Sequence, residues 1–547
     1  MSPRDIEQKV TGQPPKARPP SAHTLAWSPF RHQPFAVIWT ASLVSNIGGW
    51  MSAAASGWLM TNLDPQPLSV SLVQVAASLP LFLWAIPAGA LADTVDRKRF
   101  LVAGEIAITA ASIPLAILVG WHLITPVGLL LIIFAVSSGS AVIAPAWQAV
   151  VTQLVPRPEL PAAISANTVG INLSRAVGPA LSGVLVRMLG MAFPFWVDAA
   201  SNVAVIGALL WWRPPARAHT ALPAEPFGSA LRTGLRHARF NPLLRATLIR
   251  TAAFMLFASA YWGLLPLVVR NQIGAGPALY GALLGAIGTA AVATGLALPW
   301  ATSKVGADRL LALATLGTAV AIILFGFART APVAILAALI AGAGWMAAVS
   351  SLNVSAQVAL PEWVRGRGLA VFVTVLFGAF SIGSSLWGEV AALVGLSAAH
   401  FLAAPGAVLA AALTWNWKLQ TGEGLDLSPS MHWPAPITTR KVDGDRGPVL
   451  VTVEYRIDPN HRAAFLHALA RYSHERRRDG AYNWYVFEDP AMEGKFVETF
   501  MTDSWLEHLH QHARVTRTDR VLEQAVRRYQ IDDAPKTTHL IAVQPDT

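Results

Sequence analysis

Cysteine is absent from this chain of 547 residues. Its absence excludes disulfide bonds, thiolate catalysis and cysteine-ligated metal sites. Charged residues are also scarce, at 13% of the chain against about 25% in an ordinary soluble domain. A phosphate-binding GxxxxGKS/T loop is missing as well, so ATP is not expected to be the direct energy source.

The N-terminal stretch from Met1 to Trp27 is polar and rich in proline. It lacks the apolar core and the small-residue cleavage site of a secretory signal peptide. We therefore expect a disordered cytoplasmic tail over residues 1–33.

Apolar runs of membrane length fill the chain from Phe35 to Trp417. A helix needs about 20 apolar residues to cross the hydrocarbon core of a bilayer, and twelve segments meet this requirement. They predict a polytopic α-helical membrane protein with twelve transmembrane helices in two six-helix bundles, 34–212 and 246–417. A central cytoplasmic loop at 213–245 joins the two bundles.

The net charge of +10 comes from basic residues that cluster in alternate loops. Short loops rich in Lys and Arg normally lie on the cytoplasmic side of a membrane. The pattern favours a multi-pass protein of the bacterial inner membrane with both termini in the cytoplasm, and it explains the charge without a nucleic-acid partner. The basic loops hold Arg97, Lys98, Arg99, Arg157, Arg213, Arg217, Arg232, Arg236, Arg239, Arg245, Lys304, Arg309, Arg365 and Arg367, whereas the opposite loops hold only Arg187, Arg270 and Arg329.

The two bundles carry a weak internal repeat. A proline in each is followed by two glycines at the same spacing: Pro156, Gly178 and Gly183 in the first bundle, and Pro361, Gly383 and Gly388 in the second. Together with the six-plus-six hydropathy, this spacing predicts two related bundles about an axis along the membrane normal.

The clearest motif runs from Gly89 to Arg99, as Gly-Ala-Leu-Ala-Asp-Thr-Val-Asp-Arg-Lys-Arg, between the second and third apolar segments. It resembles the signature loop of the major facilitator superfamily, although Asp96 stands where that family usually has glycine. The resemblance implies a gate, in which a charge cluster holds the two bundles together in one state and releases them in the other. Simple positive-inside anchoring is the alternative role for the basic residues. The residues concerned are Gly89, Asp93, Arg97, Lys98 and Arg99.

Three further stretches resemble a narrower bacterial subgroup that includes the enterobactin exporter and secretion effectors. They are 144–148, 154–160 and 172–179. This resemblance implies a secondary transporter that exports a small molecule by alternating access, with protons as the coupling ion. The third stretch contains Arg175, Gly178 and Pro179, which resemble an antiporter motif. Arg175 is interpreted either as a buried partner for an acidic group of the substrate or protein, or as a structural ion pair.

The superfamily lines its central cavity with the first, fourth, seventh and tenth spans. By position, the resemblance implies a lining of aromatic rings and a few amides, which suits an amphipathic or aromatic drug, siderophore or metabolite. Packing and interfacial anchoring are the alternative roles for the tryptophans. The candidates are Asn46, Trp50, Trp147, Gln148, Tyr261, Trp262, Trp345 and Asn353.

Acidic residues inside the apolar segments are few. Charges inside membrane spans are costly and usually functional, but Glu105 and Asp198 lie near predicted span ends, where an interfacial position is the alternative interpretation. The sequence therefore offers no obvious carboxylate as the proton carrier.

The composition changes after Trp417. A linker over 418–447 precedes a segment, 448–547, whose alternation predicts the order β-α-β-β-α-β of a ferredoxin-like domain. Ser504 is the expected N-cap of a helix that starts at Trp505.

This C-terminal segment resembles the dimeric α/β-barrel domains related to antibiotic-biosynthesis monooxygenases. The resemblance rests on the pattern Tyr482-x-Trp484-x-Val486-x-Glu488 and on the stretch 496–505. It implies a self-associating or regulatory module, and the alternative is an enzyme domain that modifies the exported molecule.

Three histidines, His508, His510 and His512, fall close together on the expected helix. Steps of two residues turn successive side chains by about 200° on a helix, so the three cannot share one face, although His508 and His512 can. A solvated helix face is the simpler interpretation. No metal, cofactor or catalytic residue is predicted.

Overall fold

The computed structural model describes residues 27–213, 236–361, 363–421, 446–531 and 534–543, with isolated residues between 426 and 444. The predicted N-terminal tail, most of the central loop and most of the linker thus lie outside the described residues. The side chains that are not described inside helices are those of Gly89, Ala90, Ala92, Asp93, Thr94, Ala513 and Thr518.

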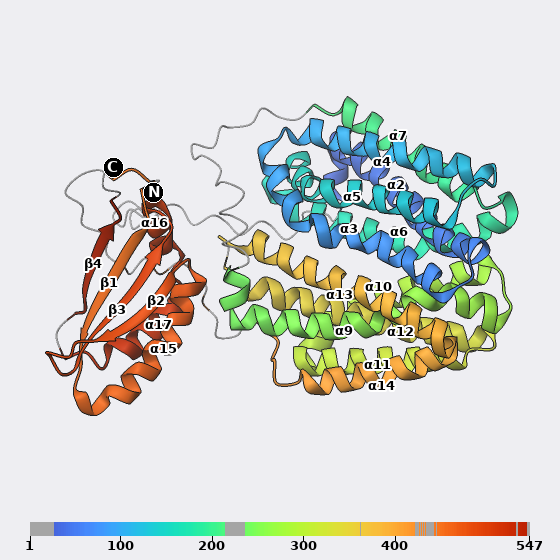
Figure 1. Cartoon of the computed structure of the whole chain (residues 1–547). Coiled ribbons are helices and arrows are strands. Elements are labelled where there is room, and N and C mark those ends of the chain that lie inside the picture. The colour runs from blue at the N-terminus through green and yellow to red at the C-terminus, as the bar shows by residue number, and fades with distance from the viewer. Residues whose placement is uncertain are drawn as a thin grey trace, which may run out of the picture.

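Long helices form two packed groups (Figure 1). The first half comprises α2 (Gln33–Leu63), α3 (Pro67–Thr94), α4 (Arg97–Gly120), α5 (Pro126–Leu154), α6 (Leu160–Leu189) and α7 (Phe193–Trp211). The second half comprises α9 (Pro242–Leu267), α10 (Pro277–Val305), α11 (Ala307–Phe327), α12 (Ala331–Val358), α13 (Arg365–Val394) and α14 (Leu396–Leu413).

Eleven helical segments in the described residues are long and apolar enough to cross a membrane. Twelve such segments were expected from the sequence, and α2 is the long helix that is not among the eleven. Hydroxyl and amide side chains, among them Ser45, Asn46, Ser52 and Asn62, lower its hydropathy.

Proline and glycine mark the ends of several helices. Proline occupies the first position of α3, α5, α9 and α10, where its missing N–H costs nothing. Gly190, Gly306 and Gly395 follow α6, α10 and α13 with φ of 94°, 83° and 89°, which glycine adopts without a steric penalty. Helix α9 begins at Pro242, inside the predicted loop, because the side chain of Asn241 accepts hydrogen bonds from the N–H groups of Leu243 and Leu244.

The two halves meet where α3 packs on α13 and α6 packs on α10. Glycines allow the close approach. A Cβ at Gly183 of α6 would lie 2.5 Å from the carbonyl oxygen of Pro277, which opens α10. A Cβ at Gly388 of α13 would overlap Ser71 of α3 and lie 3.1 Å from Cα of Leu68.

The partner glycines of the repeat pack inside each half. A Cβ at Gly178 would lie 2.6 Å from Cβ of Trp50 in α2, and a Cβ at Gly383 would overlap Ser259 and Leu256 in α9. Positions with the same spacing from Pro156 and Pro361 therefore make equivalent contacts in the two halves. The repeat read from the sequence corresponds to a shared packing scheme.

The C-terminal domain contains a four-stranded antiparallel sheet of strand order β2-β3-β1-β4. Its strands are β1 (Val449–Arg456), β2 (Tyr482–Glu488), β3 (Lys495–Thr502) and β4 (Lys536–Ile541), and its helices are α15 (Arg462–Arg478), α16 (Trp505–Arg514) and α17 (Arg517–Arg527). Val449, Val451 and Val453 are buried with Phe496 and Phe500 against the helices. The opposite face of the sheet exposes Tyr485, Phe487 and Leu540.

The domain lies beside the end of the bundle at which α9 and α13 begin (Figure 1), which we call the near end. The guanidinium of Arg236 donates to the carbonyl of Gly480. The guanidinium of Arg514 lies 4.3 Å from the ring centre of Trp363, just before α13. The ring of Trp363 meets the buried imidazole of His237 edge-on at 5.5 Å.

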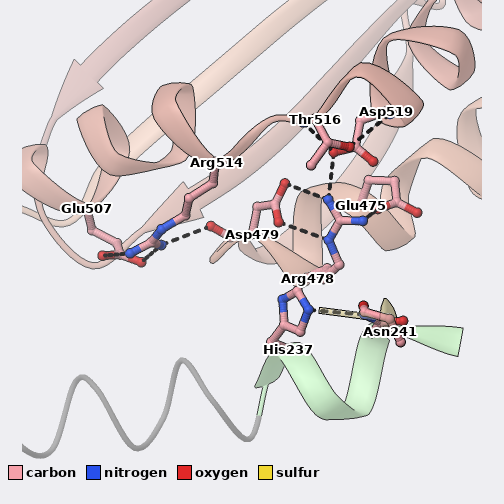
Figure 2. A network of polar contacts seen from close by, with 10 residues as sticks. His237, Asn241, Glu475, Arg478, Asp479, Glu507, Arg514, Thr516 and Asp519 are labelled. Atoms are coloured by element: carbon pink, nitrogen blue, oxygen red, sulfur yellow. Dashed lines mark hydrogen bonds and ion pairs between the residues drawn. The ribbon is translucent and has the colours of Figure 1, made fainter. Parts of the chain in front are cut away.

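Figure 2 shows the polar network around this contact. Arg478 donates to Asp479 and to Asp519, with N–O distances of 3.0 and 2.7 Å, and Arg514 pairs with Glu507. Burial, followed by the charges of Arg478 and Arg514, lowers the pKa of His237 from 6.5 to about 3. His237 is therefore neutral at pH 7, and the side-chain nitrogen of Asn241 lies 3.1 Å from its Nε2.

A second attachment lies where the linker leaves the bundle. Arg250 of α9, 2% exposed, pairs with Asp308 of α11. Asp308 also accepts a hydrogen bond from the N–H of Leu419 at 3.0 Å. The start of the linker is thus held by the second half.

Candidate functional site

Aromatic rings cluster inside the second half. The ring of Trp262 meets those of Tyr261 and Trp345 at 5.5 and 5.4 Å, and Trp345 meets Phe380 at 5.9 Å. Tyr261 is fully buried and stacks on Phe325. The indole N–H of Trp262 and the hydroxyl of Tyr261 are buried without a hydrogen-bond partner among the described residues. The structure thus brings three of the predicted cavity residues together, with the hydroxyl of Tyr261 and the indole N–H of Trp262 beside each other.

Arg175 and Trp50 meet inside the first half. The guanidinium carbon of Arg175 lies 5.3 Å from the ring centre of Trp50, a cation–π distance. The Nε of Arg175 is buried without a hydrogen-bond partner in the described part of the chain. Gly178, one turn later, provides the space beside Trp50, and the carbonyl of Pro179 approaches Gly281 of α10.

The remaining cavity candidates are more dispersed. Asn46 and Gln148 are exposed side chains of α2 and α5. Asn353 of α12 is half-buried and accepts a hydrogen bond from Gln357 at 2.6 Å. Trp147 of α5 donates its indole N–H to Oε1 of Glu105 at 2.9 Å. These four therefore do not join either aromatic group through the contacts described.

The structure describes the side chains of only part of the signature loop. Gly89 and Asp93 lie at the end of α3, where side chains are outside the description. Asp96 is the N-cap of α4 and accepts from the N–H of Arg99 at 2.9 Å, so the departure from glycine provides a helix cap. Lys98 donates to the carbonyl of Leu210 at 2.9 Å, at the end of α7. Arg97 has its Nε buried without a partner among the described residues.

Glu105 and Asp198, which lie near the predicted span ends, are covered by neighbouring helices. Each is 6% exposed, on α4 and α7, which pack together. Oδ2 of Asp198 accepts from the hydroxyl of Ser112 at 3.3 Å, while Glu105 accepts from Trp147. The two carboxylates lie close enough to interact electrostatically. Position along the chain suggested a span end, but it does not reveal that neighbouring helices cover the side chain.

The halves are closed against each other at the far end of the bundle, where α2 ends and α10 begins. Arg270, just after α9, donates to the carbonyl of Thr61 and to Oδ1 of Asn62, the latter at 3.2 Å. The rings of Trp58 and Tyr280 lie 6.0 Å apart. Nearer the middle, the hydroxyls of Ser78 in α3 and Ser381 in α13 are 2.7 Å apart. This end of the bundle is sealed by contacts between halves.

Similarity to known proteins agrees with this architecture. The multidrug efflux pump Tap of Mycolicibacterium fortuitum is 26% identical over 397 residues, covering 67% of this chain and 91% of that protein. A POT family transporter in complex with a thioalcohol-conjugated peptide aligns with a TM-score of 0.57 and 14% identity, over 70% of this chain and 95% of that one. A bacterial homologue of the human lysosomal transporter Spinster, in an inward-facing and unoccupied conformation, aligns with a TM-score of 0.55 and 13% identity, over 71% and 97%.

The family match extends further than these relatives. Residues 24–546 match the transmembrane secretion effector family, so the match includes the C-terminal domain as well as the bundle. The chain therefore belongs to the transmembrane secretion effector family of the major facilitator superfamily, and it is a multi-pass membrane transporter rather than an enzyme.

Proposed function

We propose that the protein is a proton-coupled exporter of a small amphipathic or aromatic molecule and works by alternating access. The observation that carries this proposal is the pair of equivalent glycine contacts, at Gly183 and Gly388, through which the halves close at the far end. Two related bundles that meet in this way can rock about a site between them. The efflux activity named for the similar pump Tap supports export as the direction.

The substrate site proposed here combines the two groups at mid-bundle. Trp262, Trp345 and Tyr261 offer an apolar aromatic wall, and Arg175 with Trp50 offers a cation beside a ring. A cavity with apolar walls and a few polar groups suits an aromatic or amphipathic molecule. Asn46, Trp147, Gln148 and Asn353 are proposed as peripheral contacts that approach the substrate as the halves move.

Glu105 and Asp198 are proposed as the proton-exchanging pair. Acidic residues buried in membrane spans are costly and commonly serve proton relays. Their position on α4 and α7, with Trp147 as a hydrogen-bond donor from α5, connects them to the first half's side of the cavity. Movement of α5 during the transport cycle would change the hydrogen bonding of Glu105 and hence its proton affinity.

The near end is proposed to face the cytoplasm. The basic residues of alternate loops, such as Arg97, Arg157 and Arg365, belong to this end. In this orientation both termini are cytoplasmic and the sealed far end faces outward. The helix α2 is proposed as the twelfth span, because its 31 residues contain no charged side chain and its polar groups can face a cavity instead of lipid. The charge cluster of Asp93 with Arg97 to Arg99 is proposed as the cytoplasmic gate.

The C-terminal domain is proposed as a ferredoxin-like, self-associating module without chemistry of its own. The order β1-α15-β2-β3 followed by helices and β4, with sheet order β2-β3-β1-β4, supports the ferredoxin-like arrangement. The open face of the sheet presents Tyr485, Phe487 and Leu540, each more than half exposed. A second copy of this apolar face is the proposed partner.

Transport into inverted membrane vesicles tests the function. With ethidium as the aromatic probe, we expect an acid interior to drive uptake in the native protein. Glu105→Gln is expected to abolish the response to the pH gradient while leaving binding of the probe intact. Glu389→Gln, at an exposed position of α13, is the matched control and should behave like the native chain.

Two outcomes would contradict the proposal. If uptake by the native protein ignored the imposed pH gradient, proton antiport would be wrong. If Glu105→Gln and Asp198→Asn both kept full pH-driven uptake, the coupling site would lie elsewhere in the bundle.

A further inference from the structure

Three histidines face one another inside the C-terminal domain. Ligand nitrogens of His508, His512 and His539 all lie within 4.8 Å of one another. The Nε2 atoms of His508 and His512 are 3.2 Å apart. The imidazole centres of His508 and His539 are 4.7 Å apart. Side chains from a helix and from a strand thus converge on one point.

Local structure explains this convergence. Ser504 caps α16, as expected, and accepts from the N–H of Glu507, and four-residue spacing then places His508 and His512 on one face. His539 in β4 pairs with Val451 of β1. Because Val451 is 2% exposed and faces the helices, pairing turns His539 toward α16. The sequence alone gave no reason to connect β4 with that helix.

The predicted solvated helix face is wrong for two of the three histidines on α16. His508 is 1% exposed and His512 is half-buried. His510, with its side chain 40% exposed, points elsewhere and lies 3.8 Å from Glu507. Helical periodicity correctly predicted that His510 lies on a different face of α16 from His508 and His512. It could not predict the burial of His508, which depends on Trp505 and on the sheet below it.

The other side of the His508 ring faces Gln511. Nδ1 of His508 and the side-chain amide of Gln511 are buried and interact with each other, while Nε2 of His508 faces His512. A polar neighbour on the second ring nitrogen is the arrangement that orients a histidine ligand toward a metal.

Three imidazoles are a suitable donor set for a divalent transition metal. Imidazole nitrogen is a common ligand of Zn²⁺, Cu²⁺ and Ni²⁺ and binds in its neutral form.

We propose that His508, His512 and His539 bind a divalent transition-metal ion, with Zn²⁺ as the ion whose geometry fits. Zinc–nitrogen bonds of about 2.0–2.1 Å in a tetrahedron place ligand nitrogens about 3.3 Å apart. The separation between His508 and His512 already matches this value, and a small movement of His539 completes a three-histidine set. The fourth position is open to water or another small ligand, as in three-histidine zinc sites.

Binding would join the last strand of the sheet to α16. His512 and His539 are both half-buried, so the ion can reach the site from solvent. Because the ion binds the folded domain, it stabilises that domain by mass action. This role is independent of the transport proposal, since the bundle contributes none of the three ligands.

The test uses the full chain, purified in detergent with an affinity tag that contains no histidine and stripped with a chelator. We expect one Zn²⁺ per chain by equilibrium dialysis and elemental analysis, and we expect Co²⁺ to give the visible absorption of a four-coordinate ion. His539→Gln should remove both signals. His510→Gln, on the same helix but outside the cluster, is the matched control and should retain them.

A folding control separates loss of ligand from loss of structure. Added Zn²⁺ should raise the unfolding temperature of the C-terminal domain in the native protein and in His510→Gln, but not in a folded His539→Gln variant. Absence of stoichiometric Zn²⁺ from the native chain would overturn the proposal. Equal binding by the native chain and a His508→Ala, His512→Ala, His539→Gln triple variant would do so as well, because the ion would then lie elsewhere. Transport in vesicles is expected to be unchanged in His539→Gln.

Discussion

The two halves of the bundle use the same packing scheme with different chemistry. In the first half, α4 and α7 bury Glu105 and Asp198, and Arg175 lies over Trp50. In the second half, aromatic rings gather around Trp345 of α12, which contacts rings from α9 and α13. The buried ion pair described in that half, Arg250 with Asp308, lies instead where the linker leaves the bundle.

The comparison shows which positions of the repeat are restricted by packing and which can differ between the two halves. Close helix approach requires glycine at fixed positions, since a Cβ at Gly183 or at Gly388 would overlap the opposite half. Side chains that point between the halves face no such restriction. We therefore interpret the bundle as a frame of two related halves that carry different side chains: Glu105, Asp198 and the Arg175–Trp50 contact in the first half, and the rings around Trp345 in the second.

The largest expected effect concerns the glycine contacts between the two halves, at Gly183 and Gly388. Gly183→Val and Gly388→Val should impair closure of the far end to a similar extent, because each overpacks an equivalent contact between halves. Overpacking typically costs about 1–3 kcal/mol, which corresponds to roughly a fivefold to hundredfold change in the closed population. The cysteine-free chain allows closure to be measured by disulfide formation between Ser78→Cys and Ser381→Cys, whose hydroxyls are 2.7 Å apart in the native protein.

Gly207→Val provides the control for this experiment, because nothing lies within 4 Å of the position of its added Cβ. If only one of the two glycine variants lost cross-linking, the halves would not be equivalent and the comparison would fail.

An intermediate effect is expected from the aromatic group. Trp345→Ala should raise KM for an aromatic substrate about tenfold, which is about 1.4 kcal/mol, because it removes a ring that contacts three others. Trp50→Ala should raise KM by a smaller factor, because Trp50 has one described partner in the proposed site, Arg175, which the variant retains. Kinetics of ethidium uptake distinguishes the two variants.

Trp300→Ala is the matched control, since Trp300 is 68% exposed on α10. Equal KM changes in Trp345→Ala and Trp50→Ala would show that recognition is shared between the halves.

The smallest expected effect concerns the contact of the soluble domain with the second half. Docking brings Arg478 and Arg514 close to His237 and adds to its burial, and both effects lower the pKa of His237 below the ordinary value of 6.5. Docking is therefore strongest when the imidazole is neutral and weakens as the pH falls below 6.5. Between pH 7.5 and pH 6 the docking constant should fall by up to about fourfold. Spin labels at Asn416→Cys and Val521→Cys, both exposed, report the distance between bundle and domain.

His237→Asn removes the titrating group and should remove this pH dependence. A native protein whose label distances stay constant from pH 7.5 to pH 5, or a variant that keeps the native pH profile, would contradict the role of His237.

The sequence predicts the parts of this molecule that depend on local pattern. Apolar length, Pro67 and Pro242 at helix starts and Gly395 at a helix end locate the helices, and strand alternation locates β1 and β3. The family resemblance also identified Trp262 and Trp345, which the structure brings together.

The features that the sequence did not reveal depend on contacts between distant segments. Glu105 is covered by helices whose rotation no hydropathy profile reports, and His539 reaches His508 only through the register of β4 on β1. Asp96 seemed a departure from a motif, but the structure shows it to be a helix cap. The sequence also predicts α2 to be a membrane span like the other eleven. Its polar side chains distinguish it, and it is not among the eleven segments of the described residues that are long and apolar enough to cross a membrane.

The attachment of the soluble domain makes the bundle mechanically asymmetric. The described contacts at the near end involve Trp363 of the second half and Arg236 and His237, which precede α9 and pack on that half. The Arg250–Asp308 pair that holds Leu419 also belongs to the second half. Among the described residues, the domain is therefore attached to the second half alone. A partner that held the domain still would immobilise the second half with it, and access would then alternate through motion of the first half alone.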